Sequence, residues 1–270
     1  MGGETTVRAA CLLAIAGLLC LCASARPAKG DMVSHWGFDE GSGSTTYDFA
    51  NGNHGTIYGA QWTAGITGSA LSFDGMDDYV DCGNGASTAF SSGDSFTMEA
   101  WIKYSGLPTF GAIAARHDDR FGTFNYAIGV ANSKLVFIAD HAHIGAFWLQ
   151  SDTYLVEGLW YHVAGVYDNK SRAVYINGLE QGSSLFSDGG EGDLLADFTI
   201  GKTGHWPGYS DDRYFNGVID EIKIYDTART DAEILQEYVN VVPVPSAVLL
   251  GSIGLGVSGW LCKMKKRKET

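Results

Sequence analysis

The chain has 270 residues, of which 36 are glycine and only 18% are charged, and its formal net charge is −13. This composition is typical of short strands joined by tight turns, and the length leaves room for one large β domain with appendages. So acidic a chain repels nucleic acid and anionic lipid but suits calcium and other cations, although an acidic surface that only keeps a secreted protein soluble would carry the same charge.

The first element is an apolar run over residues 9–23, which follows the basic residue Arg8. The sequence Ala23-Ser24-Ala25 then offers the small residues that a signal peptidase requires. We therefore predict that residues 1–25 are a secretory signal peptide, with an uncleaved anchor as the alternative.

The body of the chain alternates short apolar runs with turn-forming residues, and its apolar residues repeat with the period of two that marks strands. We predict strands over residues 32–38, 69–73, 78–82, 96–103, 126–130, 134–139, 160–167, 172–176, 198–202 and 215–226. We expect three hairpins among them, which span residues 69–82, 126–139 and 160–176. The pair Asn177-Gly178 indicates a type I′ turn into one further strand.

One helix is expected in the body, directly after the last strand. The sequence Thr230-Asp231-Ala232-Glu233 has the form of a capping box, and Ile234, Leu235 and Tyr238 would give the helix an apolar face. Many short strands without alternating helices predict an all-β, two-sheet antiparallel sandwich of the jelly-roll kind, and they exclude a parallel α/β fold.

The last strand carries an acid in an unexpected place. By strict alternation, Asp220 shares a face with the aliphatic residues Val218, Ile222 and Ile224. A carboxylate on an apolar face is costly unless it is paired, hydrogen-bonded or bound to a metal. We therefore expect Asp220 to have a partner, which is either a cation or a set of backbone N–H groups or a basic side chain.

The C-terminal segment, residues 241–270, contains a motif with two prolines at Pro243 and Pro245, an apolar run over residues 247–262 and a basic cluster over residues 263–268. The run is close to the minimum length of a bilayer span, and its basic tail would stay cytoplasmic. This pattern resembles the PEP-CTERM sorting signal, which implies an exosortase as processing partner and a bacterial cell envelope as location. The usual Glu between the prolines is Val244 here, and a plain transmembrane anchor is the alternative.

Six motifs of the body together resemble the laminin-G-like, concanavalin A-like jelly-roll domains. They are HWGFDEGSGSTTYDFANGNHGT, GSALSFDGMDDYVDCG, FTMEAWIK, GLWYHVAGVYD, RAVYINGLEQG and FNGVIDEIKIYDTART. The resemblance covers residues 31–239. It specifies the fold more closely than the function, because domains of this kind bind glycans, bind proteins or form parts of enzymes.

The resemblance also implies a structural calcium, held by an acid of the last strand and by groups from the first strand and an early turn. Carried onto this sequence, the ligands are Asp220, Asp39 and the turn at Asp74 and Gly75. Calcium takes six to eight oxygen ligands, which such a set can supply together with backbone carbonyls. A second oxygen cluster at Asp48, Asn51 and Asn53 is also possible, but these residues are more typical of a turn.

An aromatic segment, residues 205–214, is the expected ligand-binding loop. Trp206 and Tyr209 offer ring faces for sugars, and Asp211 and Arg213 offer hydrogen bonds to hydroxyl groups, although these aromatics would serve equally well to cap the ends of a sandwich.

Catalytic residues are harder to find. A glucanase of this fold needs two carboxylates on one strand, whereas Glu99 is a lone acid, and the nearest match, at residues 191–196, lacks the second Glu. His141 and His143 are more typical of a loop than of a metal site.

We therefore predict a non-catalytic binding module, secreted or anchored at the extracellular face of the envelope, with extracellular carbohydrate as its ligand. A structural surface or matrix protein that recognises other proteins is the alternative, and a glycoside-active enzyme is the third possibility.

Overall fold

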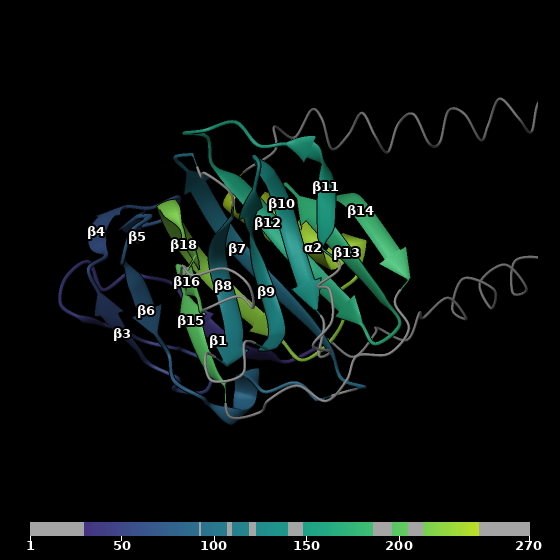
Figure 1. The fold of residues 1–270 in the computed structure, drawn as a ribbon, viewed down its shortest axis with the longest axis horizontal. Coiled ribbons are helices and arrows are strands. Elements are labelled where there is room, and N and C mark those ends of the chain that lie inside the picture. Colours follow the sequence, from purple (N-terminus) through teal and green to yellow (C-terminus); the bar gives the residue numbers. More distant parts are fainter. Residues whose placement is uncertain are drawn as a thin grey trace, which may run out of the picture. The chain divides into compact units, whose positions relative to one another are not determined.

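The structure is a computed structural model that describes residues 30–91, 93–106, 110–118, 123–139, 148–185, 196–204 and 213–242. From Met32 onward these residues belong to one compact unit. They form two eight-stranded antiparallel sheets, named sheet A and sheet B here, and a two-stranded ribbon (Figure 1). The predicted all-β sandwich with one short helix is therefore confirmed, and it fits a jelly roll. The predicted signal peptide and the apolar C-terminal run lie outside the described residues.

Sheet A contains, in spatial order, β14 (Leu179–Leu185), β13 (Ser171–Ile176), β12 (Tyr161–Asp168), β7 (Ser95–Tyr104), β18 (Asn216–Tyr225), β5 (Ser69–Asp74) and β4 (Gln61–Ala64), and β1 (Met32–Trp36) pairs with β18. Sheet B contains β11 (Leu149–Tyr154), β10 (Lys134–Ala139), β9 (Thr123–Ala131), β8 (Gly111–Asp118), β15 (Asp197–Ile200), β6 (Tyr79–Asp81), β3 (Gly55–Tyr58) and β2 (Thr45–Thr46). The ribbon pairs β16 (Lys202–Thr203) with β17 (Arg213–Tyr214), and the helices are the 3-10 turn η1 (Ala86–Thr88) and the α-helix α2 (Asp231–Val241).

Two of the three expected hairpins are confirmed. β9 pairs with β10, and β12 pairs with β13. The turn at Asn177 and Gly178 has the positive φ angles, 53° and 78°, that a type I′ turn requires. The expected hairpin over residues 69–82 is wrong. Its first strand, β5, pairs with β4 and β18 in sheet A, whereas its second, β6, pairs with β3 and β15 in sheet B. The turn at residues 75–78 thus carries the chain from one sheet to the other.

The core lies between the two sheets, where aromatic side chains from both interlock. The ring of Phe96 on β7 lies 4.8 Å from that of Tyr126 on β9 and 6.0 Å from that of Phe137 on β10. In Figure 1 the strands β8, β9 and β10 run across β7 and β12, which is the arrangement that brings these rings together. Ring pairs at this spacing contribute about 0.5–1.5 kcal/mol each beyond the burial of their surface.

The helix α2 covers the outer face of sheet A. Its capping box is present, with the Thr230 N–H donating to Glu233 Oε2 at 2.8 Å and the Glu233 N–H donating to Thr230 Oγ1 at 3.4 Å. Ile234 is fully buried against Val166 and Tyr175 of the sheet, whereas Leu235 remains 41% exposed. The helix and its start are therefore as the sequence predicted, but its apolar face is narrower than expected.

A chain of charged side chains fastens α2 to sheet A. Glu99 on β7 accepts hydrogen bonds from Arg229 at 2.6 Å, and its other oxygen lies 3.2 Å from His162 Nε2 on β12. Lys223 on β18 bridges Glu237 of the helix, at 2.7 Å, and Glu221, at 2.9 Å. Because these groups are mostly buried, each charge depends on its partner to offset its loss of water.

Candidate functional site

The acid of the last strand is fully buried, but it faces outward from the sandwich. Ile219 and Ile222 both point into the core, and the pairing of β18 with β7 shifts register between Asp220 and Lys223. Glu221 sits at this bulge with a positive φ of 51°. The extra residue inverts the alternation, so Asp220 does not share a face with Ile222, contrary to the sequence-based expectation.

A short loop buries Asp220 on that outer side. Asp220 Oδ2 accepts the backbone N–H groups of Ile66 at 2.9 Å and Thr67 at 3.4 Å. Asp220 Oδ1 is also buried, and it has no hydrogen-bond partner in the part of the chain that the structure describes. Burial raises the pKa of Asp220 to about 7, and the neighbouring charge of Glu221 adds to the rise, although the backbone hydrogen bonds oppose it. One oxygen of the acid is therefore accounted for, and the other is left available.

Asp39 belongs to the same place. Its Oδ1 accepts the backbone N–H of Ser69 at 3.2 Å, at the end of the loop that covers Asp220. A Cβ atom on Gly68 would lie 1.9 Å from Asp39 Oδ1, and one on Gly65 would lie 2.4 Å from Asp220 Oδ2. Glycine at these two positions is what lets one loop approach both carboxylates. Asp39 and Asp220 therefore contact the same loop, residues 65–69, at different residues, and a shared metal site stays a prediction.

Asp74 and Gly75 do not join them. Ser69 begins β5 and Asp74 ends it, which separates the two positions by about 16 Å at the usual rise of a strand. The neighbours of Gly75 come from Asn216, which begins β18 and pairs with Asp74. The expected four-residue set is therefore divided between the two ends of β5.

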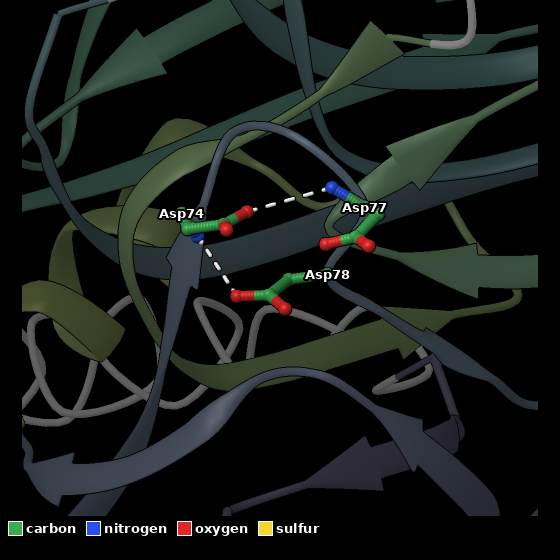
Figure 2. A group of neighbouring side chains, drawn as sticks. All are labelled: Asp74, Asp77 and Asp78. Carbon is green, nitrogen blue, oxygen red and sulfur yellow. Dashed lines mark hydrogen bonds between the residues drawn. The ribbon is translucent and has the colours of Figure 1, made fainter.

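At that other end, Asp74 forms a cluster with two acids that the sequence analysis did not single out, Asp77 and Asp78 (Figure 2). One carboxylate oxygen from each lies within 4.8 Å of the others. Figure 2 shows that Asp74 accepts the N–H of Asp77, at 3.4 Å, while the N–H of Asp74 donates to Asp78 at 2.9 Å. Burial also raises the pKa of Asp78. These hydrogen bonds give the cluster a structural role in the turn between the sheets.

Of the expected ligand-binding residues, only Arg213 lies within the described residues. It is on β17, paired with Thr203, and its side chain is 9% exposed, so it is buried rather than presented on the surface. Trp206, Tyr209 and Asp211 lie outside the described residues, as do His141 and His143. The prediction for the aromatic loop therefore stays a prediction.

The second oxygen cluster considered above, Asp48, Asn51 and Asn53, forms a turn. Asp48 is 4% exposed, and its carboxylate accepts backbone N–H groups from His35 at 2.8 Å, Ala50 at 2.9 Å and Asn53 at 3.1 Å. The two aromatic residues that flank Asp48 are exposed, Tyr47 by 47% and Phe49 by 64%. The sequence did not single out these two residues as candidates for a binding site. The signal that could have indicated them is the presence of aromatic residues inside a run of turn-forming residues.

A hollow of about 520 Å³ lies on the outer face of sheet A, between β13, β14 and the residues before α2. Its walls carry the polar groups of Glu180, Ser183 and Thr230. The aromatic residue in its lining, Tyr175, is only 4% exposed and donates its hydroxyl to Asp231 at 2.8 Å. The hollow therefore offers no open ring face.

The chain is similar to known proteins in sequence pattern and in fold. The family model described as the concanavalin A-like lectin/glucanases superfamily matches residues 74–235, which is more than half of the chain. No curated protein matches the sequence. In the described part of the chain, no helix has the length and hydropathy needed to cross a membrane.

Three solved structures illustrate the likeness. The binding domain of Paraclostridial Mosquitocidal Protein 1 has a TM-score of 0.62 at 15% identity, over 78% of this chain and 52% of that one, so this chain spans about half its length. Domain 4 of AbnA, a GH43 extracellular arabinanase from Geobacillus stearothermophilus, in complex with arabinotriose, has a TM-score of 0.58 at 22% identity, over 77% of this chain and 98% of that one. A structure of botulinum neurotoxin type C, a toxin whose cell entry is described as dependent on interaction with two ganglioside molecules, has a TM-score of 0.56 at 14% identity. The match covers 78% of this chain and 51% of that one.

Proposed function

Because this chain belongs to the concanavalin A-like lectin/glucanases superfamily, we propose that it is a non-catalytic binding module for extracellular carbohydrate. The observation that carries the proposal is the match to 98% of domain 4 of the arabinanase. That domain is one part of a larger enzyme, and its structure holds arabinotriose. The present chain supplies the same kind of sandwich as its main folded body.

The surroundings of Glu99 support a role without catalysis. Hydrolysis of a glycosidic bond requires an acid and a second carboxylate on opposite sides of the bond. Glu99, the acid that the sequence places on a central strand, is 2% exposed and is engaged by Arg229 and His162. A carboxylate held in this way has neither access to a substrate nor freedom to exchange a proton with it.

A calcium ion between Asp39 and Asp220 is the second part of the proposal. Two observations support such an ion: Asp220 Oδ1 is a buried carboxylate oxygen with no hydrogen-bond partner among the described residues, and Asp39 contacts the loop that covers Asp220. Carboxylate and backbone carbonyl oxygens are the ligands that calcium prefers. Bound there, the ion would supply the positive charge that a buried, ionised Asp220 lacks. Asp74 and Gly75 are left out of the proposed ligand set.

We place the protein outside the cytoplasm because of the predicted signal peptide and the likeness to a domain of an extracellular arabinanase. Processing by an exosortase and anchoring by residues 241–270 stay predictions, because all but the first two of these residues lie outside the described residues.

Affinity electrophoresis tests the proposed function. The full chain would be run through native gels that contain arabinan, galactan, xylan, mixed-linkage β-glucan or no polysaccharide, each with calcium. We expect at least one neutral polysaccharide to retard the protein and to release no new reducing ends after incubation with it. Unchanged mobility in every gel would contradict carbohydrate binding, and released reducing ends would indicate an enzyme.

A further inference from the structure

The loop between β2 and β3, residues 47–54, is held unusually firmly. The N–H of Tyr47 donates to Glu40 Oε1 at 2.7 Å, the N–H of Asp48 to His54 Nδ1 at 3.2 Å, and the N–H of Phe49 to the carbonyl of His35 at 2.9 Å. The carboxylate of Asp48 holds the loop from within, as described above. Each backbone donor from Tyr47 to Ala50 therefore has a partner.

This firm loop presents its two aromatic rings to solvent. Tyr47 and Phe49 flank Asp48, whose own side chain is buried, at the point where the chain enters a turn. Their exposed fractions are 47% and 64%. Rings that served only to cap the sandwich would be buried, whereas rings exposed on a rigid backbone can bind a ligand with little loss of conformational entropy.

Hydrogen-bonding groups belong to the same loop or contact its backbone. His54 is exposed and packs edge-on against Tyr47, with ring centroids 5.0 Å apart. Because its Nδ1 accepts the N–H of Asp48, the ring proton sits on Nε2, which is then a donor. The carboxylate of Glu40 and the exposed amide of Asn51 add acceptors.

From this arrangement we propose that Tyr47 and Phe49 form a binding surface for a neutral saccharide. This inference rests on the proposed function and gives it a location. Sugars present apolar C–H faces, which stack on aromatic rings, together with hydroxyl groups, which pair with imidazole, amide and carboxylate groups. Glu40 and Glu221, together with the net charge of −13, disfavour an anionic sugar.

The surface continues into the proposed calcium site. The ring of Phe49 lies 6.1 Å from that of His35, whose Nε2 is 3.0 Å from Glu221 Oε2. The other oxygen of Glu221 accepts the hydroxyl of Thr67, at 3.4 Å, in the loop that covers Asp220. Contacts of His35 and Glu221 therefore connect Phe49 with the loop that covers Asp220.

The test uses single variants of the full chain in the polysaccharide gel that retards the wild type most strongly. Tyr47→Ala and Phe49→Ala should each weaken binding by about tenfold or more. Phe49→Trp, which keeps a ring face, should retain it. The matched control is Tyr154→Ala, which removes a ring that is 65% exposed on β11 of sheet B and should leave binding unchanged. Because all three rings are exposed, melting temperatures should stay within about 2 °C of the wild type.

Each other outcome has a distinct meaning. If the wild type binds and both alanine variants bind equally well, this inference is wrong and the proposed function stands. If binding falls only together with the melting temperature and Phe49→Trp fails to restore it, the rings are structural and the inference is again wrong. If the wild type binds no polysaccharide, both are wrong. Concentration-dependent dimers that Phe49→Ala abolishes, without any sugar effect, would assign the surface to a second copy of the chain.

Discussion

At the scale of single residues, Asp220 should make the stability of the protein depend on pH. Its pKa is about 7 in the folded protein against an ordinary value of 3.8. The folded state therefore holds the proton more tightly, and the resulting stabilisation is complete below pH 3.8 and is lost as the pH rises toward 7. In a chelator, we expect this one group to lower the free energy of unfolding by about 3 kcal/mol between pH 5 and pH 8.

Urea denaturation of the wild type and of Asp220→Asn at both pH values isolates this effect, because the Asn variant keeps the shape of the side chain without its charge. Calcium at pH 8 should recover most of the lost stability in the wild type and none in the variant. The same pH dependence in both proteins would show that Asp220 is not the group responsible.

The neighbouring Glu221 behaves in the opposite way. Burial alone would raise its pKa, but hydrogen bonds and charges from His35 and Lys223 lower it to about 2. Burial thus raises the pKa of one carboxyl group of this strand, whereas basic partners lower the pKa of the next. The comparison with Asp220→Asn removes the contribution of Glu221 from the measurement, because it is common to both proteins.

Residue-scale features were the least predictable from sequence. The sequence showed that Asp220 needs a partner, and two loop N–H groups are part of the answer. The predicted orientation of its side chain was wrong, because strict alternation assumes an unbroken strand. The bulge at Glu221 arises where β18 pairs with β7, a strand that is distant in sequence. The division between Asp39 and Asp74 likewise depends on which end of β5 each contacts.

At the scale of elements, the start of α2 gives a simple prediction. Thr230→Ala removes the side-chain acceptor of the capping box and should lower the free energy of unfolding by about 1 kcal/mol. Thr230→Ser keeps the hydroxyl and serves as the control. Thermal and urea denaturation would both detect the difference, and equal stability of the two variants would mean that the cap contributes nothing.

The charged contacts between α2 and sheet A give a prediction with a larger expected effect on stability. Arg229→Met removes the guanidinium that lies 2.6 Å from the buried Glu99 and keeps the contact with His162, and the change should cost about 3–5 kcal/mol. The control is Lys170→Met, which removes an exposed charge from the turn between β12 and β13 and should change stability by less than about 0.5 kcal/mol. A loss for Arg229→Met no larger than that of the control would show that Arg229 is not the group that compensates the charge of Glu99.

Elements themselves were largely predictable, because they are set by local patterns. The alternation of residues 96–103 gave β7, and the capping box gave the first turn of α2. The predicted pairing of residues 69–73 with 78–82 was wrong for a reason outside the segment. A tight turn permits a hairpin, but β5 and β6 find their partners in different sheets.

At the scale of the whole molecule, different parts of sheet A have different surroundings. The helix α2 and its charged contacts cover β12 and β13, whereas a loop covers Asp220 on β18, and the exposed rings of Tyr47 and Phe49 lie in the loop that follows β2. The motifs in the sequence were sufficient to predict the fold, whereas the class of binding module that they indicate stays a proposal. They were not sufficient to find the rings, since exposure depends on the folded loop.

Titration calorimetry with neutral oligosaccharides, beginning with arabinotriose, tests carbohydrate binding most directly. The full chain would be titrated in calcium, and the sugar would be recovered afterwards for chromatography. We predict saturable heat with at least one oligosaccharide of the panel, which is recovered uncut. No heat across the panel would contradict a carbohydrate-binding module, and a shortened sugar would contradict a module without catalysis.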